Sequence, residues 1–516
     1  MKKIIYTLGV VMALSSCADD YLDTTPQSSV STGIILETTD NAKLALNGIC
    51  YMMARQYLTT QGFNGEGTIK TWYGNYTGND FQKCNLTGWA PITNSTYNER
   101  NTSVYLYYPW YYYYKLIGNA NAIICNIENA TGLNEEKDFI KAQALTFRAY
   151  SYFMMSQLYC KRWVDSNSGA SRGLPLRLDE SHGDLPASTL AETYKQVYDD
   201  LDEAIGLYKS SGLDRPSNDN YSPNLNVAYA VYARAALTRE DWTAAAQYAK
   251  LARDGYPLMT NSEYMDGGFN SPNQEWIWSC YGASDQTLHY YSFHAYQGAN
   301  SSASVCRTYP CGISKELYNQ IPETDVRRNM YLDPKGESYT TSNGRASSGA
   351  LYDRARKDYA NKIFETSYIF AYMQFKFLVL DQPGVGHVNN FRSAEMYLTE
   401  AEALCHIGGR DTEVQQLLVA LNKTSGRNSE YTCTKTGAEL LTEVKLYRRI
   451  DLWGEGFDWF DYKRWNQPIV RHAHADGGSF HTSFAVTINP SDNNQWTWIY
   501  PAKEVDYNAD ILSYKE

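Results

Sequence analysis

Three acidic residues in one predicted helix have the spacing best suited to acid–base chemistry. Glu395 and Glu402 are seven residues apart, so on a helix they share a face, and Glu400 lies between them. A pair of carboxylates is what glycoside hydrolysis requires. The same carboxylates could equally neutralise buried arginines of a neighbouring helix, such as Arg448 and Arg449. Spacing alone leaves both interpretations open.

A histidine cluster near the C-terminus is the closest approach to a metal-binding pattern. It comprises His472, His474, Asp476 and His481. The spacing His-x-His can bring two imidazoles to one ion on a strand. Such stretches are more often solvated loops, so we predict no metal and no cofactor. The sequence also lacks the G-x-S-x-G, H-E-x-x-H, P-loop and G-x-G-x-x-G motifs, and we assign no catalytic residue.

Aromatic residues are unusually frequent, with 45 Tyr, 12 Trp and 16 Phe among 516 residues. A flat ring matches the apolar C–H face of a pyranose, and neighbouring amides and carboxylates match its hydroxyls. We predict a shallow ligand-binding site where two aperiodic segments, residues 60–104 and 260–390, meet. Its expected members are the stacking rings Trp72, Tyr73, Trp89, Tyr290 and Tyr296 and the polar residues Asn79 and Asp80. The alternative is that these rings only pack the loops onto the scaffold.

Other aromatic residues are assigned to packing. The run from Trp110 to Tyr114 lies in a helical pattern and points all the way round the helix, so we expect most of it in the core. Trp276 and Trp278 flank Ile277 in a strand-like alternation, and we expect both to be buried.

The elements that must position these residues are mostly helical. Helical periodicity covers about residues 39–59, 105–259 and 391–465, and helix pairs joined by short turns occur near 227–255 and 391–423. They resemble degenerate tetratricopeptide units. We therefore predict a mostly α fold: one domain over residues 39–516, built as a right-handed superhelical scaffold with a few short strands. The segments 60–104 and 260–390 are then loop-rich insertions that carry the ligand.

Composition and charge exclude several classes of protein. Hydrophobic residues make up 43% of the chain and charged residues 20%, which is typical of a globular protein. The formal net charge of −11 argues against nucleic-acid binding, which needs a basic surface. No run of about 18 apolar residues is present, so no membrane-spanning helix is expected.

The N-terminus carries an export pattern. Lys2 and Lys3 precede an apolar stretch from Ile4 to Leu14, and small residues then lead to Cys17. This resembles a bacterial lipobox, so we expect a signal peptide over residues 1–16 and a lipid on Cys17. The alternative is an ordinary signal peptide with a coincidental cysteine. Residues 17–38 are then a polar tether, in which Asp19 and Asp20 resemble the acidic export signal of surface lipoproteins.

The remaining nine cysteines give a weaker signal. Cys306 and Cys311 are five residues apart in a loop-like segment, so a disulfide between them is possible in an oxidising compartment. There is no C-x-x-C motif, which makes a thiolate zinc site improbable.

Several segments, taken in chain order, resemble the SusD/RagB family of lipoproteins. The matching segments are CADDYLDTTP at 17–26, AQALTFRAYSYF at 142–153, LAETYKQVYDDLDEAI at 190–205, AEMYLTEAEA at 394–403, WGEG at 453–456 with FDYKRW at 460–465, and YPAKE at 500–504. These matches are spread in order from residue 17 to residue 504, so the resemblance covers nearly the whole mature chain. Because the acids of residues 395–402 fall inside a scaffold motif of the family, we take their role to be structural.

The resemblance implies a function and a location. It implies a cell-surface lipoprotein of the outer membrane that captures oligosaccharides or polysaccharides without cleaving them. Its expected partner is a SusC-like TonB-dependent transporter. The alternatives are a peptide-capturing member of the same family and a helical glycoside hydrolase. Ligand residues cannot be transferred from the family, because its functional loops vary freely.

The sequence departs from the family pattern at two positions. The family usually has an acid where Tyr447 stands and often an arginine where Asp458 stands. Both positions lie in what looks like a packing motif, and the departures put an ion pair there in doubt.

Overall fold

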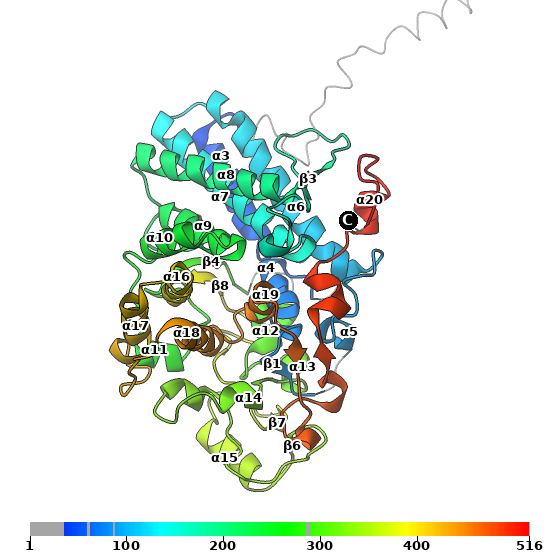
Figure 1. Ribbon diagram of the computed structural model, residues 1–516, viewed down its shortest axis with the longest axis vertical. Coiled ribbons are helices and arrows are strands. Elements are labelled where there is room, and N and C mark those ends of the chain that lie inside the picture. The colour runs from blue at the N-terminus through cyan, green and yellow to red at the C-terminus, as the bar shows by residue number, and fades with distance from the viewer. Residues whose placement is uncertain (1–35, 59–61, 86–87, 285–288, 515–516) are drawn as a thin grey trace, which may run out of the picture.

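The chain forms a mostly helical structure with a few short strands, which confirms the predicted fold class (Figure 1). The computed structural model describes residues 36–58, 62–85, 88–284 and 289–514. The expected signal peptide, Cys17 and most of the expected tether lie outside these ranges. Over the ranges described, no helix combines the length and the apolar character needed to cross a membrane.

Four long helices form one end of the scaffold. They are α3 (Thr39–Met52), α6 (Val104–Asn126), α7 (Asn134–Tyr159) and α8 (Leu190–Ser211). Local sequence sets their ends: Thr38 caps α3 by accepting a hydrogen bond from Asn41 N at 3.1 Å. Thr189 and Glu192 form the predicted capping box of α8, and Gly212 ends it with φ 64°.

Two helical hairpins continue the scaffold, as the periodicity predicted. They are α9 (Leu225–Arg239) with α10 (Trp242–Ala252), and α16 (Ser393–Ile407) with α17 (Asp411–Val419). Asp241 accepts a hydrogen bond from Ala244 N and so caps α10. α18 (Gly437–Asp451) and α19 (Asp458–Arg464) follow, and α19 lies near the centre of the molecule in Figure 1.

The strands of the described residues form five antiparallel pairs. They are β1 (Phe81–Lys83) with β5 (Cys311–Ile313), β2 (Arg172–Pro175) with β3 (Ala187–Thr189), β4 (Trp276–Cys280) with β8 (Val388–Arg392), β6 (Arg345–Ala346) with β7 (Ile369–Phe370), and β9 (Ile469–Val470) with β10 (Thr487–Ile488). The β1–β5 pair joins the two segments that the sequence marked as aperiodic.

Those two segments contain short helices rather than open loop. The first holds α4 (Gly65–Thr68), a π-helix (Ile69–Tyr76) and α5 (Ala90–Thr93). The second holds α11 (Asn261–Met265), α12 (Phe293–Gln297), α13 (Ser304–Arg307), α14 (Lys315–Tyr318) and α15 (Ala350–Asp358). The last short helix of the chain, α20 (Ala502–Val505), lies near the C-terminus (Figure 1).

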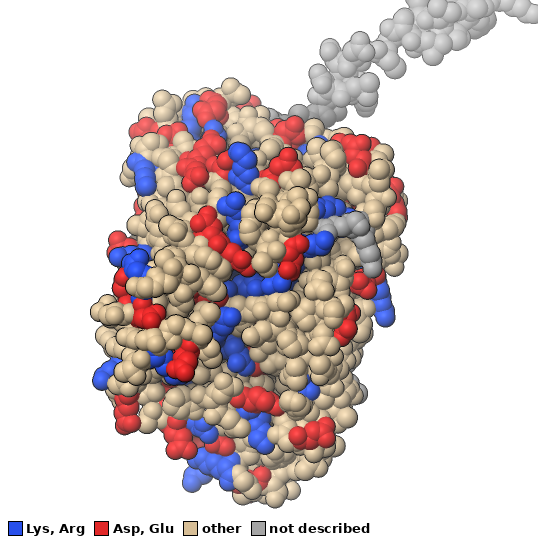
Figure 2. All heavy atoms as spheres, viewed as in Figure 1, with Lys and Arg blue, Asp and Glu red and all other residues tan. Residues whose placement is uncertain are grey.

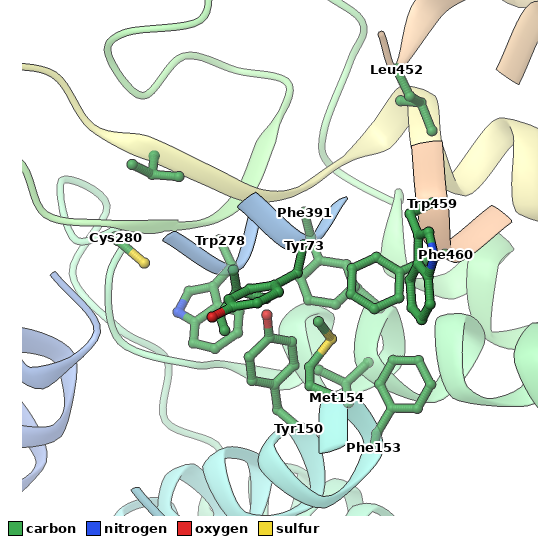
Figure 3. Packing of buried hydrophobic residues seen from close by; sticks show 14 of the residues in the cluster. Tyr73, Tyr150, Phe153, Met154, Trp278, Cys280, Phe391, Leu452, Trp459 and Phe460 are labelled. Carbon is green, nitrogen blue, oxygen red and sulfur yellow. The ribbon is translucent and has the colours of Figure 1, made fainter. Parts of the chain in front are cut away.

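Aromatic rings dominate the core. Trp110, Tyr112 and Tyr113 are buried, so most of the run on α6 packs inside, as predicted. Trp276 and Trp278 are fully buried in β4, which confirms their packing role. Figure 3 shows how rings from several elements share one buried cluster with aliphatic side chains. Rings of this size contribute about 2–3 kcal/mol each through buried apolar area.

The cysteines and the two departures from the family pattern have plain structural roles. All nine described cysteines are free, so no disulfide joins Cys306 and Cys311. Tyr447 is buried in the core. Asp458 accepts hydrogen bonds from Asp80 N at 2.6 Å and Phe81 N at 3.1 Å, which ties α19 to the loop before β1. Burial raises the pKa of Asp458 to about 8, and the neighbouring Asp80 carboxylate adds to the shift.

Candidate functional site

The two loop-rich segments meet at the ring of Tyr296. Trp89 presents an edge to this ring with centroids 5.3 Å apart, and Trp72 does so at 6.0 Å. Tyr291 lies 6.4 Å from it within the second segment. Lys83 Nζ donates a hydrogen bond to the Tyr296 carbonyl at 3.3 Å. We call Trp72, Trp89, Tyr291 and Tyr296 the Tyr296 cluster.

The members of this cluster differ in what they offer to solvent. Trp72 and Tyr296 are 1% and 2% exposed and form its interior. Trp89 and Tyr291 are half-buried, and the nearby Tyr290 is 57% exposed. A ring that is packed against the protein on one side and exposed to solvent on the other can stack on a ligand. The accessible aromatic surface is therefore that of Trp89, Tyr290 and Tyr291.

Three predicted stacking rings are packing residues instead. Trp72 packs against Phe63 and Tyr105 as well as Tyr296. Tyr73 is fully buried in the core cluster of Figure 3, and its hydroxyl donates to the Tyr105 carbonyl at 2.8 Å. Tyr296 is 2% exposed and lies against Trp72 and Trp89. A ring with almost no exposed face cannot stack on a sugar, so the structure corrects the expectation for all three. For Trp72 and Tyr73 the reason is the π-helix at 69–76, in which every residue is buried.

The two predicted polar contacts are also held inside the protein. The Asp80 carboxylate accepts hydrogen bonds from Arg449 at 2.7 and 2.8 Å, and it is 2% exposed. Asn79 is buried, and its side-chain oxygen accepts from Val470 N at 2.7 Å. Their hydrogen-bonding capacity is used to fix the loop, so the structure corrects both expectations.

Polar atoms inside the Tyr296 cluster lack partners. The Trp72 indole N–H and the Tyr296 hydroxyl are buried and have no hydrogen-bond partner among the described residues. Burial raises the pKa of Tyr296, so the phenol stays protonated. A buried donor without a partner is costly, and a water molecule or a ligand hydroxyl would satisfy it.

A groove at the start of α6 lies beside this cluster. Its volume is about 360 Å³, and its lining residues are Leu58, Asn101, Thr102, Val104, Tyr107, Pro501, Ala502 and Lys503. Tyr105, which lies on the same turn of α6, packs against Trp72 with centroids 5.8 Å apart. The groove, here called the α6 groove, is thus linked to the Tyr296 cluster through Tyr105 in the first turn of α6.

A larger hollow has a different character. It has a volume of about 640 Å³, and its lining residues are Lys161, Asp165, Ser166, Asn167, Ala170, Ser171, Arg172, Pro186, Ala187, Asp510, Ile511, Leu512 and Ser513. No aromatic ring is among its described lining residues, so it offers no platform for a sugar ring. Figure 2 shows acidic and basic side chains mixed over one face of the molecule, with basic side chains gathered in a hollow near its centre.

The acids considered for catalysis are taken up by buried ion pairs. Glu395 pairs with Arg234 at 2.6 Å, Glu400 with Arg253 at 2.5 Å, and Glu402 with Arg464 at 2.6 Å. Burial alone would raise the pKa of Glu402, but the Arg464 guanidinium outweighs it and lowers this pKa to about 2. The structural interpretation is confirmed, whereas the named partners were wrong. Arg448 pairs with Asp461 at 2.7 Å, and Arg449 pairs with Asp80.

The histidines of the C-terminal stretch have different surroundings. His472 lies 3.0 Å from Glu316, and burial lowers the pKa of His474 to about 4. Within the described part of the chain, no three His, Cys, Asp or Glu side chains are placed to hold a metal ion.

Sequence reasoning missed the residues of the α6 groove. Tyr111 belongs to the aromatic run that the sequence pattern assigns to the core, Tyr107 lies just before that run, and Lys503 lies in the YPAKE segment. The spacing of these residues could have revealed the outer face of α6. Positions 107, 111 and 115 are four residues apart and share one face of the helix, whereas Tyr108 and Tyr112 are buried in the core.

Family models cover almost all of the described chain. One, described as "Starch-binding associating with outer membrane", matches residues 20–237, and another, described as "SusD family", matches residues 243–514. A search of curated proteins found no match.

Solved structures share the fold. A SusD-like carbohydrate-binding protein from Bacteroides vulgatus superposes with a TM-score of 0.74 at 22% identity, over 93% of this chain and 98% of that one. A SusD superfamily protein from Bacteroides thetaiotaomicron superposes with a TM-score of 0.72 at 23% identity, over 93% of this chain and 100% of that one. A laminarin-binding SusD-like protein superposes with a TM-score of 0.63 at 17% identity, over 92% of this chain and 98% of that one. The second family model alone spans more than half of the sequence, and the chain belongs to the SusD family.

Proposed function

We propose that this chain is a surface lipoprotein of the outer membrane that binds oligosaccharides or polysaccharides and delivers them to a SusC-like TonB-dependent transporter. The observation that carries the proposal is the accessible aromatic surface of Trp89, Tyr290 and Tyr291, where the two loop-rich segments meet beside the α6 groove. The description of the first matched family as starch-binding supports it.

The proposed site is suited to capture and release. Stacking on a few rings is tolerant of sugar identity, and a shallow surface excludes little water. A capture protein must release its ligand to the transporter, so we expect a Kd of roughly 10 μM to 1 mM. This corresponds to a binding free energy of about 4 to 7 kcal/mol. One or two rings then carry most of the binding energy.

The proposal assigns no catalysis to the chain. A glycosidase needs two carboxylates free to exchange protons or attack the sugar. Glu395, Glu400 and Glu402 are instead committed to arginines. A lid over a transporter has no need to cleave its ligand.

Attachment and partnership complete the proposal. A lipid on Cys17 would hold the protein at the membrane, because each buried methylene contributes about 0.8 kcal/mol. A stable complex with the transporter would bury at least about 1,000 Å². Co-purification of a TonB-dependent barrel with the tagged full-length protein in mild detergent tests this part.

The ligand class is tested with residues 18–516 in affinity gels that contain different polysaccharides. We expect retardation by at least one glycan with no release of reducing ends. Retardation with product release would instead support a hydrolase. Binding of peptides with no retardation by any glycan would support the peptide-capturing alternative.

A further inference from the structure

Two tyrosines and two lysines form a row along the outer face of α6. Tyr107 and Tyr111 are one turn apart, with ring centroids separated by 5.7 Å. Lys503 Nζ lies 4.8 Å from the centre of the Tyr107 ring, and Lys115 Nζ lies 5.7 Å from that of Tyr111. Both rings are half-buried, so each keeps an accessible surface. The row thus has two aromatic rings with an ammonium group at either end.

These ammonium groups have no acidic partner in the described part of the chain. Neither Lys115 nor Lys503 forms a salt bridge there. The carboxylate of the adjacent Glu504 accepts hydrogen bonds from Trp110 Nε1 at 3.0 Å and Asn508 Nδ2 at 2.8 Å. The protein as a whole carries a net charge of −11. Lys115 and Lys503 therefore form a locally basic surface beside aromatic rings, in a protein whose overall charge is negative.

The Lys503 end of the row opens into the α6 groove. This groove has a volume of about 360 Å³, within the usual range for small-molecule sites of roughly 300–1,000 Å³. Asn101 and Thr102 line it together with Tyr107 and Lys503. Amide and hydroxyl groups of this kind bind sugar hydroxyls, and a tyrosine ring binds the apolar face of a sugar.

We propose that the α6 groove binds an acidic oligosaccharide, with a sugar ring against Tyr107 and the sugar's carboxylate or sulfate group paired with Lys503. Lys115 would attract a second acidic group further along the chain. This inference rests on the proposed function and names its substrate class. An exposed cation–π contact is weak, so the Lys503 ammonium can leave the ring and turn to the anion. A charge-assisted hydrogen bond of that kind is stronger than the contact it replaces.

The test compares acidic and neutral glycans with matched variants of the whole mature chain. The probes are oligogalacturonate, which carries carboxylates, chondroitin sulfate, which also carries sulfates, and the neutral glycans starch and laminarin. We expect at least one acidic probe to bind, and Lys503→Met to weaken that binding roughly tenfold, because a hydrogen bond to a charged group is lost. Lys503→Arg should keep most of the affinity.

Further variants separate this site from a general charge effect. Lys195 is an exposed lysine of α8 that pairs with Asp199, so Lys195→Met removes the same charge elsewhere and should leave binding within twofold. Tyr107→Ala should abolish binding of the acidic probe, because the ring against which the sugar packs is removed. Lys503→Met should leave the thermal stability unchanged, so that its loss of affinity cannot come from unfolding. Raising the salt concentration should weaken acidic probes much more than neutral ones.

The outcomes decide the inference separately from the proposed function. If neutral glycans bind and acidic ones do not, or if Lys503→Met binds the acidic probe as well as the wild type does, the inference is overturned and the proposed function stands. If no glycan of either kind binds, both are overturned. Preference for oligogalacturonate over chondroitin sulfate, or the reverse, identifies the anionic group.

Discussion

Arg449 of α18 holds the carboxylate of Asp80 through two hydrogen bonds of 2.7 and 2.8 Å, across a sequence separation of 369 residues. The Trp453 indole N–H donates to the Asp80 carbonyl at 2.9 Å, so both the side chain and the backbone of Asp80 are fixed. The loop before β1 is thereby attached to the helical scaffold. Asp80 serves to position this loop against the scaffold.

Removing the Asp80 charge should therefore destabilise the protein rather than weaken ligand binding directly. We expect Asp80→Asn to lower the free energy of unfolding by about 2 kcal/mol, because Arg449 loses its hydrogen bonds to a carboxylate and only the nearby Asp458 is left to neutralise it. Urea unfolding measures this. As a control, Asp199→Asn breaks an exposed pair with Lys195 and should cost less than about 1 kcal/mol. A stable Asp80→Asn variant that has lost glycan binding would make Asp80 a ligand contact after all.

The buried rings of the first loop-rich segment should behave as core residues. Trp72→Ala and Tyr73→Ala should each lower the free energy of unfolding by about 3–5 kcal/mol, since each leaves a large cavity. The folded fraction of each variant should keep its glycan affinity. Thermal unfolding and affinity electrophoresis, run on the same preparations, test both statements. Full stability together with lost binding would restore these rings as stacking platforms.

Sequence periodicity predicted the scaffold well for a physical reason. Helix pairs such as α9 with α10 carry their apolar spacing, capping residues and turns within about 30 residues, so local sequence determines them. The site lies between segments that are about 200 residues apart. Which face of Trp72 or Trp89 is covered depends on Tyr296 and on the π-helix at 69–76, and neither effect leaves a local pattern. The sequence therefore predicted that aromatic residues form the site, but not which of their rings are exposed to solvent.

Stability should fall at acidic pH in a way that depends on His294. Burial lowers the pKa of this residue from 6.5 to about 4, and His294 Nε2 lies 2.8 Å from the His387 carbonyl. Between these pH values the unfolded chain binds more protons than the folded protein does. The contribution of the neutral imidazole is therefore complete above pH 6.5 and is lost as the pH falls toward 4.

The size of this loss should be roughly 3 kcal/mol, at about 1.4 kcal/mol for each unit of pKa shift. Urea unfolding at neutral pH and near pH 4.5 measures it, and His294→Asn should make the pH dependence smaller by most of this amount. The exposed His182 offers a matched control, and His182→Asn should leave the pH dependence unchanged. Equal pH dependence in the wild type and His294→Asn would contradict the assignment.

Membrane attachment should depend on one side chain. Cys17→Ala should release the protein into the soluble fraction, because the lipid is the proposed anchor. Fractionation at high salt, in cells that lack the transporter, checks this without interference from the partner. A variant that still sediments with the outer membrane under those conditions would contradict lipid anchoring at Cys17.

The most direct test of the central claim is titration of a binding glycan into the mature chain and into Trp89→Ala, Tyr290→Ala and their double variant. We expect the wild type to bind with a Kd of roughly 10 μM to 1 mM. The double variant should show no detectable binding, with a melting temperature close to that of the wild type. This result would identify the surface beside the Tyr296 cluster as the capture site. Wild-type affinity in the double variant would contradict it and would place the ligand elsewhere on the protein.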